Sequence, residues 1–285
     1  MHGRLPEALW HRGESAWAKG LRRPAAIHSF LEGPVIIGDT IMVLDVAWGR
    51  ILAVDPSGRF DVVLEYDGAP NGLAVVDGCE FAIADARRGF VWVEGSPHTS
   101  LAVSRVKEDW MGDSFHGLND LIVTRDGGIL ATDQGSSGLH DPYGRVVHLA
   151  SDGTESVVLD GLPSPNGLAL VSDTELLVAM TRDNSIWRIP LTEQGEPFRV
   201  GRYIQLSGGI GPDGIAVTPD GWLLVAHLGM GVVWLFDPEG RRSGAFEAPE
   251  GRATSNVAID LERGEIVVTE SETGSVLIAD IPRYG

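Results

Sequence analysis

Residues 166–170 read Asn-Gly-Leu-Ala-Leu, and related stretches occur six times along the chain. The six copies begin 39, 48, 47, 47 and 43 positions apart, at Glu32, Asn71, Asn119, Asn166, Asp213 and Asn256. Each is followed by further β-rich runs, punctuated by turn dipeptides such as Asp126-Gly127. Four-stranded repeats of about 45 residues are typical of propeller blades. We therefore predict an all-β fold, a six-bladed β-propeller with four-stranded blades.

The last repeat has no fourth strand, because the chain ends soon after its third β-rich run at residues 276–279. An unpaired outer strand would be an aggregation hazard. The run at residues 25–30 has the right length to pair there, so we expect an N-terminal strand to close the last blade. The expected organisation is an N-terminal extension at residues 1–24 and a single propeller domain at residues 25–285. Trp10, Trp17 and Leu21 fit a short amphipathic helix in the extension.

The composition narrows the classes of partner. The 285 residues carry a formal net charge of −18, which disfavours nucleic acid and anionic membrane surfaces as partners. The single cysteine, Cys79, excludes an internal disulfide and a multi-thiolate metal site. The first 24 residues contain no signal-like apolar run, and no apolar stretch is long enough to span a membrane. We expect a cytoplasmic monomer or small homo-oligomer.

We call the first residue of each copy its repeat head. In a propeller the innermost strands line the central channel, so the six repeat heads should form a ring. Every head offers a side-chain oxygen, from two carboxylates and four carboxamides. Burying these groups without a cation would be costly. Ca²⁺ suits such mixed oxygen ligands best, with Mg²⁺, Mn²⁺, Zn²⁺ or Fe²⁺ as alternatives. One bound divalent cation is therefore expected.

A second interpretation of the heads is plain turn chemistry. Asn-Gly and Asp-Gly are favoured in tight turns because Asn and Asp tolerate left-handed backbone conformations. We retain this interpretation for Asn256 and leave it open for Asn71.

From about Ala25 onward the sequence resembles the senescence-marker-protein/gluconolactonase family, also called the regucalcin family. The resemblance is carried by Glu32-Gly33-Pro34, Gly117-Leu118-Asn119-Asp120, Pro165-Asn166-Gly167-Leu168 and Pro212-Asp213-Gly214. It implies Glu32, Asn166 and Asp213 as metal ligands, with Asn119 as a fourth ligand or a substrate contact. It also implies hydrolysis of lactones. Some sugar lactonases place an Arg where this chain has Gly117, so recognition of a polyhydroxylated lactone through that contact is not expected.

The expected function is a metal-dependent lactonase that converts a small or sugar-derived lactone to the hydroxy acid. Asp213 is the expected catalytic residue, because it can steer or deprotonate the attacking water. Side chains near the channel mouth are expected to contact the substrate, although each has an ordinary structural role as its alternative; they are Trp48, Asn71, His116, Asn119, His140 and His227. The alternative functions are a phosphotriesterase or arylesterase using the same metal, and a non-catalytic calcium- or ligand-binding propeller.

Overall fold

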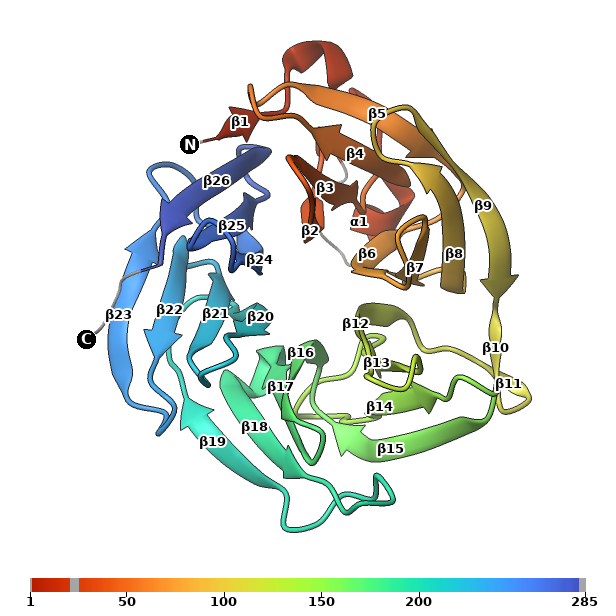
Figure 1. Cartoon of the computed structure of the whole chain (residues 1–285), viewed down its shortest axis with the longest axis vertical. Coiled ribbons are helices and arrows are strands. Elements are labelled where there is room, and N and C mark those ends of the chain that lie inside the picture. Colours follow the sequence, from red (N-terminus) through yellow and green to blue (C-terminus); the bar gives the residue numbers. More distant parts are fainter. Residues whose placement is uncertain (1, 21–25, 282–285) are drawn as a thin grey trace.

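Six four-stranded antiparallel sheets surround a central axis in the computed structural model, which describes residues 2–20 and 26–281 (Figure 1). Each sheet is one blade, and the sequence-based prediction of a six-bladed, four-stranded propeller is confirmed. The first strand of each sheet lies innermost, and each inner strand contacts the inner strands of both neighbouring blades. Within the described ranges, no helix has the length and hydropathy needed to cross a membrane.

The four strands of a blade run from the axis outward in sheet order. The inner strands are β2 (Leu31–Ile37), β6 (Pro70–Val75), β12 (Leu118–Val123), β16 (Pro165–Ser172), β20 (Gly211–Val217) and β24 (Thr254–Asp260). The second strands are β3 (Thr40–Asp45), β7 (Glu80–Asp85), β13 (Ile129–Asp133), β17 (Glu175–Met180), β21 (Leu223–Leu228) and β25 (Glu265–Glu270). The third strands are β4 (Arg50–Val54), β8 (Gly89–Ser96), β14 (Gly144–Leu149), β18 (Ser185–Pro190), β22 (Val232–Phe236) and β26 (Ser275–Asp280).

The outer strands are β5 (Phe60–Glu65), β9 (Ser100–Lys107), β15 (Glu155–Leu162), β19 (Gly201–Gln205), β23 (Arg242–Glu247) and, for the last blade, β1 (Gly3–Arg4). A small hairpin of β10 (Asp109–Trp110) and β11 (Asp113–Ser114) links blades two and three. The short helices are η1 (Glu7–Leu9), α1 (Ala16–Gly20) and η2 (Thr181–Asp183).

The hydrophobic core is divided among the interfaces between neighbouring blades. One cluster joins Met42 and Leu44 of blade one to Phe81 and Ile83 of blade two, and these four side chains are at most 1% exposed. The middle strands of a blade are covered on both faces, which explains why β3 is buried throughout and apolar from residue 41 to residue 44. Outer strands such as β15 alternate in burial or are largely exposed because one face meets solvent.

The inner strands pack so closely that the residue after a repeat head has no room for a side chain. A Cβ at Gly72 would lie 2.6 Å from the Asp120 Oδ1 atom of the next blade, and one at Gly167 would lie 2.6 Å from the Asp213 carbonyl oxygen. A Cβ at Gly214 would meet the Asn256 side chain. Because these three glycines do not have positive φ, they serve close packing, and the turn interpretation does not describe them.

Each inner strand also changes register at its repeat head. In all six blades the inner strand gains one residue relative to the second strand at this point, as between Glu32 and Val35 in β2. Such bulges bend a strand locally and re-aim its side chains. The polar heads therefore break the strict alternation of the strands in the same place in every blade.

An N-terminal strand closes the last blade, as expected, but it is not the predicted one. The pairing strand is β1, in which Gly3 and Arg4 lie opposite Val276 and Ser275 of β26. The expectation for residues 25–30 was therefore wrong for residues 26–30; Ala25 lies outside the described residues. Two residues suffice because the preceding His2 N–H and the following Leu5 N–H donate to the Val276 and Gly274 carbonyls. Blade six thus begins inside the segment expected to be a separate extension.

Residues 9–20 and 26–30 instead pack beside blade one, held by a buried ion pair. The Arg50 Nε atom donates to the Asp45 Oδ2 atom at 3.1 Å, and both side chains are at most 3% exposed. Arg50 Nη1 also donates to the Leu9 carbonyl at 2.8 Å, while Asp45 Oδ1 accepts from the Phe30 N–H at 2.9 Å. The pair therefore fastens both ends of this segment. Trp17 lies in α1, and its ring contacts that of Phe30. Trp10 lies outside α1, directly after η1, so a single helix through Trp10 and Trp17 does not form; Leu21 lies outside the described residues.

Removing residues 1–5 should destabilise the protein, because β26 loses its partner and the buried Leu5 side chain is lost. Leu5→Ala in the full chain keeps β1 and is the matched control, with an expected loss of about 2–5 kcal/mol typical of buried Leu truncations. Thermal unfolding with light scattering would compare the two. Equal melting temperatures of the truncated and full-length chains would show that β1 does not close the ring energetically.

Candidate functional site

Three of the four predicted metal ligands are buried at the same end of the inner strands. Glu32, Asn166 and Asp213 are 4%, 6% and 5% exposed and come from β2, β16 and β20. Asn119, in β12, occupies the equivalent position and is half-buried. The four predicted ligands therefore lie on four of the inner strands that surround the axis.

Glu32 lies in an environment that disfavours its negative charge. Burial raises the pKa of its carboxyl well above the ordinary value, and the nearby charges of Asp213 and Asp120 raise it further. Two donors oppose this effect: the Asn256 Nδ2 atom lies 3.1 Å from Glu32 Oε2, and the Gly33 N–H donates to the same oxygen at 3.2 Å. These contacts do not offset the burial of several acidic groups, and a cation would.

Asn256 uses its carboxamide within the protein. Its Nδ2 donates to Glu32, and its Oδ1 accepts the Val257 N–H at 2.8 Å. With its oxygen engaged in this way, Asn256 supports Glu32, and the site can form without it as a ligand. Asn71 is half-buried in β6. Its contact with substrate stays a prediction.

The carboxamides of Asn119 and Asn166 are arranged differently. The Asn119 Nδ2 atom donates to Gln134 Oε1 at 3.0 Å, and the Asn166 Nδ2 atom donates to Thr181 Oγ1 at 3.1 Å. Because each nitrogen is directed to its own blade, the oxygen on the other side of each amide remains available for a ligand. Sequence patterns indicated the two asparagines but gave no sign of the roles of Gln134 and Thr181.

Asp120 is a further acidic residue beside the predicted ligands. In the sequence it stood out only as the last residue of the Gly117-Leu118-Asn119-Asp120 motif. Its carboxyl lies against Gly72 of the neighbouring inner strand, and it accepts the Leu121 N–H at 2.8 Å. Burial raises its pKa to about 7, although a hydrogen bond from the Asn256 side chain acts in the opposite direction. Asp120 therefore adds a third carboxyl beside Glu32.

The residues present fit a hard divalent cation. Carboxylates of Glu32 and Asp213 with carboxamide oxygens of Asn119 and Asn166 form a mixed oxygen set of the kind that Ca²⁺ accepts. No group of three or more His, Cys, Asp or Glu side chains in the described ranges is placed to hold a metal ion. A cation here would consequently depend on the two amide oxygens as well as on the acids.

The predicted histidines have different surroundings. His227 is fully buried: its Nε2 lies 3.0 Å from the Gly208 carbonyl, its Nδ1 accepts from Trp234 at 2.9 Å, and burial lowers its pKa. Both ring nitrogens of His227 are thus engaged within the protein, and its substrate contact stays a prediction. His116 is exposed at the loop before β12, with its Nδ1 3.8 Å from the Asp133 carboxylate, and His140 is exposed in the loop after β13.

Trp48 supports the N-terminal segment. Its Nε1 atom donates to the Ile27 carbonyl at 3.1 Å, and its ring stacks on His11 at 4.2 Å. Together with Trp17 and Phe30 it belongs to an apolar cluster beside the ends of the inner strands, which we call the apolar wall; its other members are Ile27, Val46, Ala47, Ala69, Ala86, Leu228 and Ala253. The apolar wall draws on blades one, two, five and six, whereas blades three and four present Gln134 and Thr181 at the equivalent level.

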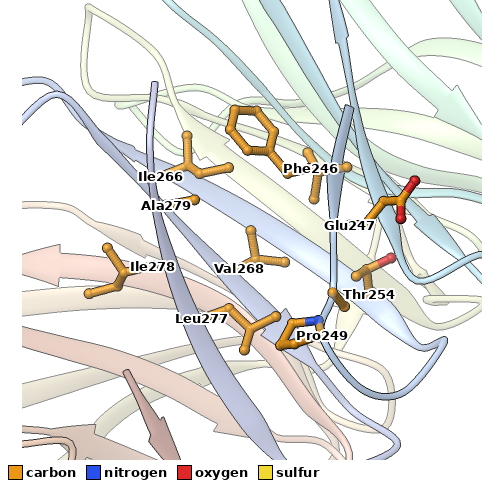
Figure 2. Close-up of a pocket in the computed structure, with 11 residues that line it drawn as sticks. Phe246, Glu247, Pro249, Thr254, Ile266, Val268, Leu277, Ile278 and Ala279 are labelled. Atoms are coloured by element: carbon orange, nitrogen blue, oxygen red, sulfur yellow. The ribbon is translucent and has the colours of Figure 1, made fainter. Parts of the chain in front are cut away.

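The cavities found elsewhere in the fold do not include the repeat heads. A cavity of about 80 Å³ lies between blades five and six, where Phe246, Val268 and Leu277 are among its apolar lining residues (Figure 2). A second, of about 260 Å³, lies between blades two and three beside Trp92 and Arg105. Both lie between sheets; the first is mainly apolar, and the second also has the Lys107–Glu155 ion pair in its lining.

Comparison with known proteins gives a family match over most of the chain. Residues 30–272 match a family model described as the SMP-30/Gluconolactonase/LRE-like region. The chain is 29% identical to a gluconolactonase of Zymomonas mobilis over 74% of its own length, and the match spans 61% of that relative's length. It is 26% identical to a diisopropyl-fluorophosphatase of Loligo vulgaris over 89% of this chain and 90% of that protein.

Among solved structures, the fold is similar to that of a gluconolactonase from Xanthomonas campestris. The two superpose with a TM-score of 0.77 at 25% identity, covering 89% of this chain and 86% of the other.

Without divalent cations, the free energy of unfolding should fall as the pH rises from about 6.5 to 8.5. A carboxyl with a raised pKa stabilises the folded state below its ordinary pKa and loses that contribution as pH rises through the folded value, about 7 for Asp120. Glu32 acts in the same direction. Histidines with a lowered pKa, such as His227, change the free energy of unfolding mainly below a pH of about 6.5.

Thermal unfolding in excess chelator at both ends of this interval would measure the effect. The expected loss from Asp120 over this interval is about 1 kcal/mol or slightly less, and Asp120→Asn should show a smaller loss than wild type. A wild-type stability that is flat or rises over the interval would contradict the raised pKa values.

Proposed function

Because the chain belongs to the SMP-30/gluconolactonase/LRE-like family, we propose that it is a metal-dependent lactonase that hydrolyses a small lactone to its hydroxy acid. The observation that carries the proposal is the buried pair Glu32 and Asp213 in one ring with two carboxamides whose nitrogens are turned away. These side chains could hold a cation beside the carbonyl oxygen of an ester or lactone. Relatives named as lactonases support the reaction class.

Four side chains would hold the cation: Glu32, Asn119, Asn166 and Asp213. A bound divalent cation polarises a carbonyl oxygen and neutralises the negative charge that develops there. Glu32 and Asp213 supply the negative charge of the site, and the two carboxamides supply neutral oxygens. In its ionised form Glu32 is stabilised by the Asn256 Nδ2 and Gly33 N–H donors.

We propose that Asp213 is the catalytic residue that orients the attacking water and accepts its proton. Its carboxylate is buried at the head of β20, where a water beside it would be shielded from bulk solvent. Proton transfer from this water to Asp213 leaves hydroxide-like character on the oxygen that attacks the lactone carbonyl. Ring opening then needs a proton on the leaving alkoxide, and the same carboxyl can return it. His116 remains the alternative base.

The surroundings of the ring favour a small lactone with little polar decoration. Ala47, Ala86 and Leu228 of the apolar wall lie at the second-strand ends of blades one, two and five. They offer no hydrogen bonds to sugar hydroxyls, and Gly117 provides no side chain before Asn119. Besides Asn71 of blade two, the polar groups we propose for substrate contact come from blades three and four, with His116, Asn119 and Gln134 on blade three.

A phosphotriesterase or arylesterase activity is the second candidate. Its support is the fluorophosphatase relative, which matches along nearly the whole of both chains. The same four oxygens could hold the cation, and the electrophile would be phosphorus or an aryl ester carbon. A third candidate is a non-catalytic calcium-binding propeller, which any metal-dependent ring opening would rule out.

Glu32→Gln should abolish cation binding and turnover together, because it removes one of the two charges in the ligand set. We expect cation affinity to fall by at least about 100-fold, the upper end for changes to groups that merely support ligands. Turnover would be measured on a panel of lactones, aryl esters and phosphotriesters, with Ca²⁺ and with chelator. Glu94→Gln, at an exposed position on β8, is the control. Full activity of Glu32→Gln, or activity unaffected by chelation, would refute the metal-dependent mechanism.

Asp213→Asn distinguishes the role of Asp213 as a metal ligand from its role as a base, because the Asn side chain keeps an oxygen and lacks the basicity of a carboxylate. At saturating cation, with occupancy measured in the same sample, kcat should fall on the order of 10²-fold or more. Asp61→Asn, an exposed change on β5, should leave kcat unchanged. A near-normal kcat in Asp213→Asn would reduce Asp213 to a ligand and direct attention to His116.

A further inference from the structure

One position in every blade lies just beyond the inner ring. Fifteen residues after each repeat head, where the second strand of the blade ends, stand Ala47, Ala86, Gln134, Thr181, Leu228 and Ser271. Only two of these side chains accept a hydrogen bond from the repeat head of their own blade: Gln134 from Asn119 and Thr181 from Asn166. These are the two heads whose neutral oxygens the proposed metal site requires.

Thr181 determines which way the Asn166 carboxamide faces. Its hydroxyl has a single proton, which it donates to the Pro212 carbonyl at 2.8 Å. Toward Asn166 the Thr181 oxygen can therefore only accept, and it lies 3.1 Å from Asn166 Nδ2. A reversed amide would bring the Asn166 oxygen against the Thr181 oxygen with no proton between them. Both residues are buried, so water cannot easily repair that mismatch.

The same hydroxyl joins the heads of two adjacent blades. Pro212 immediately precedes Asp213, so Thr181 connects the Asn166 side chain to the backbone that carries Asp213. The backbones also approach closely here, since a Cβ on Gly211 would meet the Thr181 carbonyl. Thr181 is itself held by its N–H, which donates to the Ser164 carbonyl at 3.0 Å. Thr181 is therefore held by three hydrogen bonds, to the Asn166 side chain and to the Pro212 and Ser164 carbonyls.

We propose that Thr181 is a positioning residue for cation binding: its hydroxyl holds the Asn166 oxygen toward the axis and fixes Asn166 relative to Asp213. The inference rests on the proposed function, because it assigns Asn166 as a ligand. Gln134 is the counterpart in blade three. Its hold on Asn119 is weaker because both residues are only partly buried and an amide can turn.

The test compares Thr181→Val with Thr181→Ser in the full chain, using Ca²⁺ as the probe and calorimetric titration as the readout. Val keeps the shape of Thr and lacks the hydroxyl, whereas Ser keeps the hydroxyl. We expect Ca²⁺ affinity to fall about 10- to 100-fold in Thr181→Val, the range typical of groups that orient metal ligands. Thr181→Ser should remain within about threefold of wild type, since the orienting hydrogen bond persists.

Thr132→Val is the matched control. Thr132 is a buried threonine near the end of β13, and its hydroxyl accepts the Asp120 backbone N–H rather than a side-chain amide. It should cost stability in chelator without a comparable loss of Ca²⁺ affinity. The increase in melting temperature on adding Ca²⁺ should likewise shrink in Thr181→Val and persist in Thr132→Val.

The outcomes separate this inference from the proposed function. Equal Ca²⁺ affinity of wild type and Thr181→Val would overturn the inference alone. So would an affinity in Thr181→Ser or Thr132→Val as low as in Thr181→Val, because the hydroxyl would then not be the cause. Absence of Ca²⁺ binding by the wild-type chain would overturn the proposed metal site and this inference with it. If Thr181→Val does not fold, Gln134→Met provides the same comparison, with a smaller expected loss and the same overturning result.

Discussion

The close approach of six inner strands around one axis is the constraint on which the rest of this structure depends. It excludes a side chain after the heads of β6, β16 and β20, where glycines lie against the next blade. It also accompanies a bulge in every inner strand, so that the head residue leaves the ordinary alternation of the strand. Close packing and the presentation of polar groups are thus two results of the same geometry.

Gathering these heads creates an electrostatic problem that the protein solves only in part. Burial raises the pKa of Glu32 and of Asp120, and the charges of Asp213 and Asp120 raise the pKa of Glu32 further. Asn256 gives both of its polar atoms to this network, which relieves some of the cost. The remaining imbalance favours a cation, and the neutral oxygens of Asn119 and Asn166 point to where it would be held.

The N-terminal segment connects the stability of the ring with the character of the site. Gly3 and Arg4 form the outer strand of blade six, and Phe30 lies close to β2, which carries Glu32. The buried Asp45–Arg50 pair holds the segment at Leu9 and Phe30. The segment also contributes Trp17 and Ile27 to the apolar wall, so it would border the proposed site.

The sequence by itself determined the blades, since each blade is a local unit of four adjacent strands whose hydrophobic runs and turns can be followed along the chain. It also indicated the six heads, because they recur at the blade spacing. Only the tertiary structure decided which segment closes the ring, because a two-residue strand at Gly3–Arg4 is too short to leave a hydrophobic pattern in the sequence. It alone also assigned the Asn256 oxygen to the Val257 N–H and Thr181 to the Asn166 amide. These choices depend on hydrogen bonds made only when bulged strands and neighbouring blades come together, and no local pattern records them.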